Sequence, residues 1–375
     1  MRILHTSDWH LGMSDQNMSL KEDQIAFIDE ICGIVEKENI DVVVIAGDVY
    51  DRSLSSGEAK QLYSYAMDKL CVQLKKRVIC IAGNHDGPEQ LANCGSLLEQ
   101  AGLFVLGALE KEPVIVETEE ADFYLMPWFT EEKVKTLYPE KREEITSLTD
   151  AYGVVCDKAR ETFAPGKKHI AVSHAFISGS TTSTSDRAAV IGFASQVPVS
   201  VFDGFDYVAL GHIHKPQNVG KNARYSGTPM AYSFGQEEKQ EKSVTIIDTV
   251  DMKPYEVYLH PLHERTTITG TFEEVMHYDC SDSVRNGFVR ADVTDIYLGM
   301  ETVSQLYARY PKLVTYSGKT YQSEEGGVRM SMEEFKELES NPLAIFESFC
   351  RENCGEEPSE HLKQLFLAAM DGEVE

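Results

Sequence analysis

Residues 41–48 read Asp-Val-Val-Val-Ile-Ala-Gly-Asp, a short apolar run that ends in a glycine and a carboxylate. The run is rich in β-branched residues, so it predicts a buried strand. Gly47 permits an unusual backbone conformation at the end of this strand. Asp48 then emerges either as a turn or cap residue, which is the commoner role, or as a bridging metal ligand.

The same pattern, an apolar run followed by polar and Gly-rich residues, recurs from Met1 to about Arg265. The runs are Arg2 to His5, Asp41 to Ala46, Arg77 to Ala82, His169 to Val172 and Asp206 to Leu210. Between the first two runs, a β-α-β unit is predicted by apolar residues at helical spacing: Ile25, Ile28, Ile31, Cys32 and Val35. A second helix is predicted by Ala59, Leu62, Ala66 and Leu70. This alternation is typical of an α/β domain.

The composition is typical of a folded protein, and we expect no membrane helix. Of 375 residues, 42% are hydrophobic and 26% are charged, which argues against extended disorder. The longest apolar stretches are far shorter than the roughly 18 residues that a membrane span needs. His5 and Asp8 interrupt what would have to be the apolar region of a signal peptide, so we expect a cytoplasmic protein. The eight cysteines form no C-x-x-C pair and are expected to be reduced thiols.

The net charge of -26 argues against a nucleic-acid partner, because phosphate binding normally requires a basic surface. The charge of a whole chain does not report the field inside a cleft, however, and bound divalent cations would reverse its sign there. If DNA is the substrate, we expect this chain alone to bind it weakly and a partner to supply part of the affinity.

Three segments stand apart from the alternating pattern. Residues 178–186 are polar, which predicts a mobile surface loop, and contact with a substrate is a second interpretation because they follow His174. After about Thr266, short strand-like segments indicate a small α+β addition. From Ser331 onward, twelve Asp and Glu residues stand against three Lys and Arg. One interpretation of that tail is a solvated pair of helices. The other is a partner-binding segment, which is indicated by an apolar stripe of Leu343, Phe346 and Phe349.

Each of the five apolar runs leads into residues that can bind a metal ion. Active sites of α/β sheets lie at the ends of the strands, so we expect these side chains to converge. Singly each motif is weak, since a strand-end Asp or His is more often a turn residue or a hydrogen-bonded one. Together they predict a dinuclear metal site from Asp8, His10, Asp48, Asn84, His85, His174, His212 and His214.

In this order the motifs D-x-H, G-D, G-N-H-[DE], H and G-H-x-H resemble those of the calcineurin-like metallophosphoesterases. Within that superfamily, three stretches are similar to the SbcD group of double-strand-break repair nucleases. They are Thr-Ser-Asp-Trp-His-Leu-Gly at 6–12, Tyr-Val-Ala-Leu-Gly-His-Ile-His at 207–214 and Arg-Tyr-Ser-Gly-Thr-Pro at 224–229. Residues 341–346, Asn-Pro-Leu-Ala-Ile-Phe, are similar to the SbcC-binding tail of that group. The chain departs from the pattern at Met13, where a basic residue is expected, and at Gln236, where Glu is more usual.

The resemblance implies an α/β fold, a four-layer α-β-β-α sandwich with a small α+β capping domain and a helical C-terminal tail. It implies a metallophosphoesterase nuclease domain at 1–265, a capping, DNA-recognition domain at 266–330 and an SbcC-binding tail at 331–375.

The resemblance also implies a role for each ligand-type residue. Asp8, His10 and His214 would hold the first metal ion, and Asn84, His174 and His212 the second. Asp48 would bridge the two ions. His85 would not be a ligand but would stabilise the transition state and protonate the leaving oxygen. Nitrogen and oxygen ligands suit Mn, Fe or Zn, and the resemblance favours two Mn2+ ions.

The function implied is that of a DNA endonuclease and 3′ to 5′ exonuclease that processes hairpins and DNA ends in repair and recombination. The partner implied is an SbcC-type ATPase, because the chain has no G-x-x-x-x-G-K-[ST] motif of its own, and the assembly implied is a heterotetramer containing two copies of this chain. A phosphatase or cyclic-nucleotide phosphodiesterase on the same scaffold is the alternative enzyme. A DNA-tethering scaffold without activity is the alternative that is not an enzyme.

Overall fold

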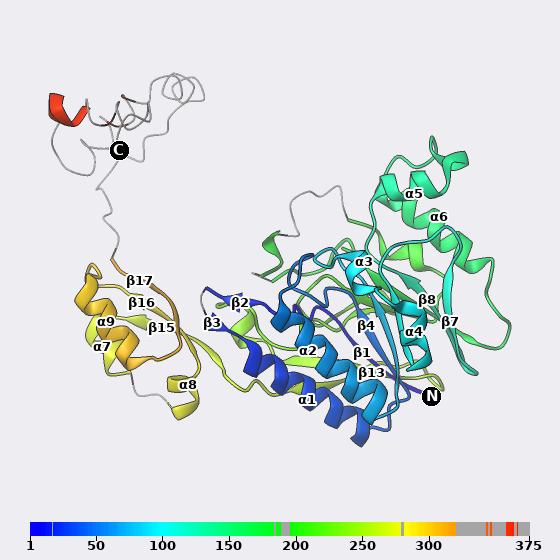
Figure 1. Cartoon of the computed structure of the whole chain (residues 1–375), viewed down its shortest axis with the longest axis horizontal. Helices are drawn as coiled ribbons and strands as arrows, with labels where there is room; N and C mark the ends of the chain where they lie inside the picture. Colours follow the sequence, from blue (N-terminus) through cyan, green and yellow to red (C-terminus); the bar gives the residue numbers. More distant parts are fainter. Residues whose placement is uncertain are drawn as a thin grey trace. The chain divides into compact units, whose positions relative to one another are not determined.

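The computed structural model describes residues 1–16, 18–183, 185–188, 196–278 and 281–319, and beyond these only positions 343, 346, 358–363 and 366. The chain divides into two units, Met1–Lys319 and Thr320–Glu375 (Figure 1). The tail expected at 331–375, and the stretch 341–346 within it, lie outside the described residues except at those positions. In the part of the chain that the structure describes, no helix has the length and apolar character needed to span a bilayer.

Two six-stranded sheets form the body of the first unit. The first has the order β14-β13-β1-β4-β5-β6, with β1 Arg2–Thr6, β4 Val42–Ala46, β5 Arg77–Ile81, β6 Leu103–Leu106, β13 Lys242–Asp248 and β14 Tyr255–Leu259. The second has the order β11-β12-β10-β9-β8-β7, with β7 Val114–Glu117, β8 Ala121–Met126, β9 Lys168–His174, β10 Tyr207–Gly211, β11 Gln217–Val219 and β12 Ala223–Tyr225. All five apolar runs are therefore strands, and within each sheet the strands among them run parallel.

Alternate residues of each strand bury opposite faces of its sheet, as the period of two in an extended chain requires. In β4, Val42 and Val44 face the second sheet, where they pack among residues such as Phe123 and Ile170. Val43 and Ile45 face the helices on the other side. Because both faces are covered, β4 is apolar throughout, and its residues are at most 2% exposed.

Helices cover the outer face of each sheet, which gives the four layers α-β-β-α (Figure 1). On the first sheet lie α1 Lys21–Lys37 and α2 Gly57–Met67, and the chain continues from α2 into a π-helical turn at Asp68–Gln73. On the second sheet lie α5 Glu131–Leu137 and α6 Leu148–Arg160. Two short helices precede β6, α3 Pro88–Leu91 and α4 Gly95–Gln100, and a hairpin of β2 Ser14–Asp15 and β3 Met18–Ser19 follows β1. The four-layer sandwich is the architecture predicted from the sequence.

A three-stranded parallel sheet with its own core follows the sandwich. Its elements are β15 Arg265–Gly270, α7 Phe272–Met276, α8 Asp282–Asn286, β16 Phe288–Val293, α9 Met300–Arg309 and β17 Leu313–Ser317. Arg265 joins this sheet to the sandwich. Its guanidinium group stacks over Phe234 and Phe288, with its central carbon 5.1 and 5.0 Å from the ring centres, and forms an ion pair with Asp15. The Arg265 side chain is 2% exposed, so this contact is almost dry.

Substituting Arg265→Ala should lower the free energy of unfolding by about 3 kcal/mol, because it leaves Asp15 without its buried partner and removes the cation from between two rings. Urea unfolding of the full chain measures this change. Arg52→Ala is the matched control, since the Arg52 side chain is 80% exposed and pairs with its neighbour Asp51. Equal stability losses in the two variants would refute a special role for Arg265.

Candidate metal centre

The residues expected to bind metal lie where the five parallel strands end, at one edge of the sandwich. Asp8 and His10 follow β1, Asp48 follows β4, and Asn84 and His85 follow β5. The second sheet contributes only imidazoles, with His174 at the end of β9 and both His212 and His214 just after β10. The structure thus brings together side chains from segments more than 200 residues apart.

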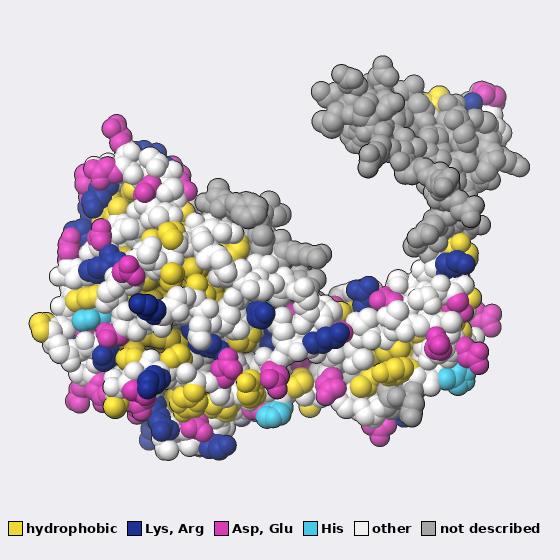
Figure 2. Space-filling model, turned by 180° about the vertical axis from the view of Figure 1, so that it is seen from behind, with side chains coloured by type: hydrophobic (Ala, Val, Ile, Leu, Met, Phe, Trp, Pro, Cys, Tyr) yellow, Lys and Arg dark blue, Asp and Glu magenta, His cyan; other side chains and the backbone are white. Residues whose placement is uncertain are grey.

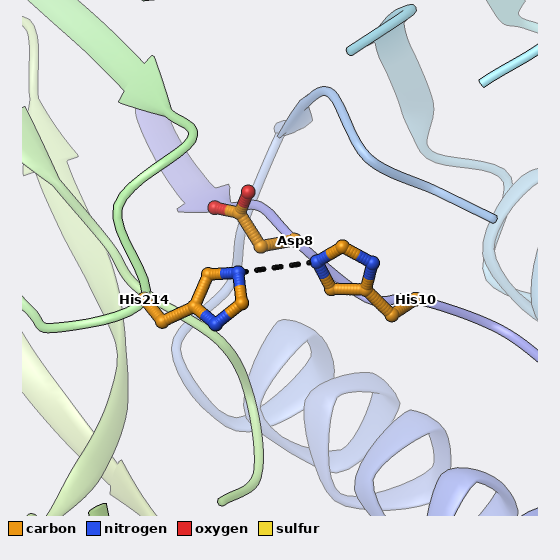
Figure 3. Close-up of side chains that lie close together, drawn as sticks. All are labelled: Asp8, His10 and His214. Atoms are coloured by element: carbon orange, nitrogen blue, oxygen red, sulfur yellow. Dashed lines mark hydrogen bonds between the residues drawn. The ribbon is translucent and has the colours of Figure 1, made fainter. Parts of the chain in front are cut away.

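Asp8, His10 and His214 form the first group. One ligand atom from each lies within 4.8 Å of the others, and the three residues are 0, 3 and 8% exposed. Figure 3 shows the two rings directed at one another beside the carboxylate, with the Nε2 atoms of His10 and His214 3.2 Å apart. Two nitrogens this close, next to a carboxylate, form a pocket of ligand atoms of the type that a small cation occupies.

Asn84, His174 and His212 form the second group, around the amide oxygen of Asn84. That Oδ1 atom lies 3.1 Å from His174 Nε2 and 2.9 Å from His212 Nδ1, and the two nitrogens are 3.3 Å apart. The Nδ1 atom of His174 lies 2.9 Å from the carbonyl oxygen of Ala46, to which it donates when neutral, so its Nε2 keeps the lone pair that a metal ligand needs.

Asp48 lies between the two groups. Its Oδ2 atom is 3.3 Å from His174 Nε2 and 3.9 Å from His10 Nε2, while its Oδ1 atom accepts a hydrogen bond from the His85 main chain at 2.9 Å. Asp48 is 1% exposed. A carboxylate that faces one imidazole of each group has the placement that a bridging ligand requires.

The backbone around the site is held in a sparsely populated conformation. Asp8, His10, Asp48 and His212 have φ angles of 54, 43, 49 and 104°, in the left-handed region that side-chain-bearing residues rarely adopt. Such strain persists only where the surrounding structure enforces it, and it concentrates at functional sites. Gly83 permits the close packing here, because a Cβ at that position would lie 2.1 Å from Asp48 Oδ1.

The electrostatics of the site favour neutral imidazoles at His10, His212 and His214. Burial lowers the pKa of His10 and His212 to about 3 and that of His214 to about 4. Burial also raises the pKa of Asp8 to about 7. Neutral imidazoles and buried carboxylates are the groups that a divalent cation stabilises, and among the described residues the buried Nδ1 of His10 has no hydrogen-bond partner. The residues present therefore fit a bound divalent metal.

His85 differs from the ligands in its surroundings. Its Nδ1 atom lies 2.9 Å from the main-chain oxygen of Asp51, which fixes the ring and leaves Nε2 free of protein partners among the described contacts. The His85 ring meets the His10 ring edge to face, with their centres 4.9 Å apart. Half-buried beside the first group, His85 presents Nε2 next to the ligand-type atoms, with a lone pair when the ring is neutral and an N–H when the ring is doubly protonated.

Two further residues beside the site, Asp86 and Trp9, support the loops that carry it. Asp86 is 4% exposed and accepts hydrogen bonds from the main chains of Val49, Tyr50 and Gly83, so it ties the β4 and β5 loops together. Trp9 is fully buried against Phe27, which excludes stacking on a ligand.

Other contacts had no signal in the sequence. Gln24 of α1 donates to the main-chain oxygen of His10 at 2.8 Å, and the Tyr232 hydroxyl donates to that of Trp9. Ser185 and Asp186 contact His214, although their stretch was expected to be a mobile surface loop. The stretch around Ser185 and Asp186 is polar and aperiodic and predicts only a loop, and nothing in the sequence singles out Gln24 or Tyr232.

Comparison with known proteins finds a family model, a curated relative and solved structures that match this chain. The family model described as calcineurin-like phosphoesterase matches residues 1–216. The SbcD subunit of the nuclease SbcCD from Staphylococcus epidermidis is 28% identical over 379 residues, and the match covers all of both chains. Two solved structures match 69% of this chain. TT1561 of Thermus thermophilus is 10% identical with a TM-score of 0.39 over 99% of that chain, and the phosphoesterase Yfce of E. coli is 14% identical with a TM-score of 0.29 over all of it.

Metal binding should strengthen as the pH rises toward about 9. Burial opposes a charge on His174, but the adjacent Asp48 carboxylate raises its pKa to about 9, so the metal-free chain holds a proton there at neutral pH. That proton must leave before the imidazole can bind a cation, which predicts about a tenfold gain in affinity per pH unit between 7 and 9. Calorimetric titration with Mn2+ in two buffers of different ionisation enthalpy measures the released proton. Affinity independent of pH across this interval would contradict the assignment of His174 as a ligand.

Proposed function

The chain belongs to the calcineurin-like phosphoesterase family, and on that premise we propose that it is a metal-dependent nuclease that hydrolyses phosphodiester bonds in DNA. The choice of DNA as the substrate rests on the full-length match to the SbcD subunit of a nuclease. That match includes the residues beyond 216, which the family model does not cover. The proposed activities are endonuclease and 3′ to 5′ exonuclease, acting on hairpins and DNA ends in repair and recombination.

We assign the first metal ion to Asp8, His10 and His214, the second to Asn84, His174 and His212, and the bridge to Asp48. The distances within each group and the position of Asp48 between the groups support this division. Mn2+ is the proposed ion, since all donors are nitrogen or oxygen. Two bound ions would supply an activated water and neutralise charge on the phosphate.

The residues of the chain itself supply orientation and a proton. Asp86 ties the loops that carry Asp48 and Asn84, so the phosphate meets ligands in a fixed geometry. His85, anchored through its Nδ1–H, is proposed to act as a doubly protonated ring that gives the second proton, at Nε2, to the leaving oxygen of the cleaved strand. No serine or cysteine nucleophile is needed in this scheme.

We further propose three functional parts: nuclease domain 1–265, capping and DNA-recognition domain 266–330, and SbcC-binding tail 331–375. The absence of a nucleotide-binding G-x-x-x-x-G-K-[ST] motif from the sequence supports an SbcC-type ATPase as the partner that supplies ATP-driven work. A homodimer within a heterotetramer, in the cytoplasm, completes the proposal, with the early helices α1 and α2 as the contact surface.

The surface charge is consistent with shared DNA binding. On the face shown in Figure 2, Lys and Arg side chains are scattered singly among acidic and hydrophobic ones and form no continuous stripe. With a net charge of -26, affinity for the phosphate backbone would come from the bound cations and from the partner.

The His85→Ala variant should bind metal normally but lose DNA cleavage by roughly a hundredfold or more, because it removes the proposed proton donor and no ligand. The test is cleavage of labelled single-stranded and hairpin DNA by the purified full chain with Mn2+, beside a phosphomonoester. His260→Ala is the matched control, since that side chain is 84% exposed and pairs with Glu30.

Normal DNA cleavage by a metal-replete His85→Ala variant would refute the role of His85. Turnover of the phosphomonoester without DNA cleavage by the unaltered chain would leave the metal site in place and move the function to a phosphatase. Two bound ions without activity on either substrate would favour the tethering scaffold.

Removal of the residues after about Ser331 should abolish binding to an SbcC-type ATPase and spare simple phosphodiester hydrolysis. The described metal centre lies entirely within Met1–Lys319, so the deletion leaves it intact. A pull-down with the ATPase partner and hydrolysis of bis(p-nitrophenyl) phosphate measure the two properties separately. An unchanged pull-down would disprove the assignment of the tail.

A further inference from the structure

We propose that Ser183, Ser185 and Asp186 form a directional hydrogen-bond chain that orients the imidazole of His214 as a metal ligand. The inference rests on the metal site of the proposed function and adds positioning residues to it, from a loop whose polar, aperiodic sequence shows no sign of them.

The start of this loop is fixed by the surrounding structure. The main-chain N–H of Ser178 donates to the carbonyl oxygen of Val197 at 2.9 Å, which closes the base of the loop. Further along, the side chain of Gln217 bonds both main-chain groups of Thr181, at 2.8 and 2.7 Å. The segment that follows therefore approaches His214 from a defined position.

The chain itself links an imidazole to a carboxylate through two hydroxyl groups. His214 Nδ1 lies 2.6 Å from Ser185 Oγ, Ser185 Oγ lies 3.0 Å from Ser183 Oγ, and Ser183 Oγ donates to Asp186 Oδ2 at 2.9 Å. Asp186 also accepts the main-chain N–H of His214 at 3.0 Å, and that of Ser183 at 2.5 Å. With Ser183 and Asp186 4 and 1% exposed, water has little access to these partners.

The carboxylate sets the direction of every bond in the chain. An ionised carboxylate only accepts, so the Ser183 hydroxyl donates to Asp186 and its oxygen accepts from Ser185. The Ser185 hydroxyl is then committed as a donor, and its oxygen accepts the proton on His214 Nδ1. His214 is thereby held in the tautomer whose Nε2 carries a lone pair, and this Nε2 is the atom directed at His10 in Figure 3.

The two metal groups are consequently oriented by different parts of the fold. In the second group, His174 is fixed by the carbonyl oxygen of Ala46, at the end of strand β4. In the first group, the His214 ring is fixed by Ser185 of the loop at 2.6 Å, and its Nδ1 atom also lies 3.4 Å from Asp186 Oδ1. Substitutions in the loop should therefore weaken the binding of one metal ion and leave the binding of the other unchanged.

The test is Mn2+ titration of the full chain by calorimetry, comparing Ser185→Ala, Ser185→Thr and Thr181→Ala. Ser185→Ala should weaken the binding of one of the two ions roughly ten- to a hundredfold. This is the usual loss of affinity when a metal-bound histidine loses its hydrogen-bond partner. Ser185→Thr retains the hydroxyl and should restore binding. Thr181→Ala is the control in the same loop, because the exposed Thr181 makes its two contacts through the main chain.

Unchanged binding of both ions in Ser185→Ala would overturn the inference, and so would equal weakening of both, which indicates general damage to the site. Thermal unfolding of the metal-free variants separates these effects from loss of folding, and the expected result is an unchanged midpoint. Binding of fewer than two ions by the unaltered chain would overturn the proposed metal site itself, together with this inference.

Discussion

The structure depends on one buried carboxylate, that of Asp48, placed where two sheets meet. Asp48 faces His10 from the first sheet and His174 from the second, and burial of these groups without charge compensation is unfavourable. Burial opposes ionisation of Asp48, but His174 holds its pKa far below the ordinary value, so the carboxylate stays ionised and attracts cations. The strained backbone, the close packing at Gly83 and the convergence of five strand ends all hold ligand-type side chains around this charge.

Much of the fold could be predicted because the apolar runs that form the strands lead directly into the residues of the candidate site. An apolar run buried on both faces must be a strand between layers, and Asp48 after such a run must lie at the sheet edge. The pairing of the strands could not be predicted, because the local sequences of β8 and β13 do not indicate which strands they pair with. The helix predicted from Ala59 to Leu70 is present with its apolar face buried. The chain changes to π-helical geometry from Asp68, which apolar spacing does not reveal.

The candidate site was predictable in its residue types and not in its supporting contacts. His212 and His214 stand out because an H-x-H motif after a strand is rare, whereas Asp86 looks like any loop acid until its three main-chain donors are known. The stretch containing Ser185 is short, polar and aperiodic, so its contact with His214 across 29 residues left no trace in the sequence.

The residues of the candidate centre come from both sheets, so they are synthesised at different times. The main-chain N–H of His212 donates to Asp8 Oδ1 at 2.9 Å, which joins the last part of the centre to be synthesised to the first. A growing polypeptide therefore lacks part of this set of side chains until His214 has emerged from the ribosome. The candidate centre can assemble only after the strands of the second sheet that carry His174, His212 and His214 have been synthesised.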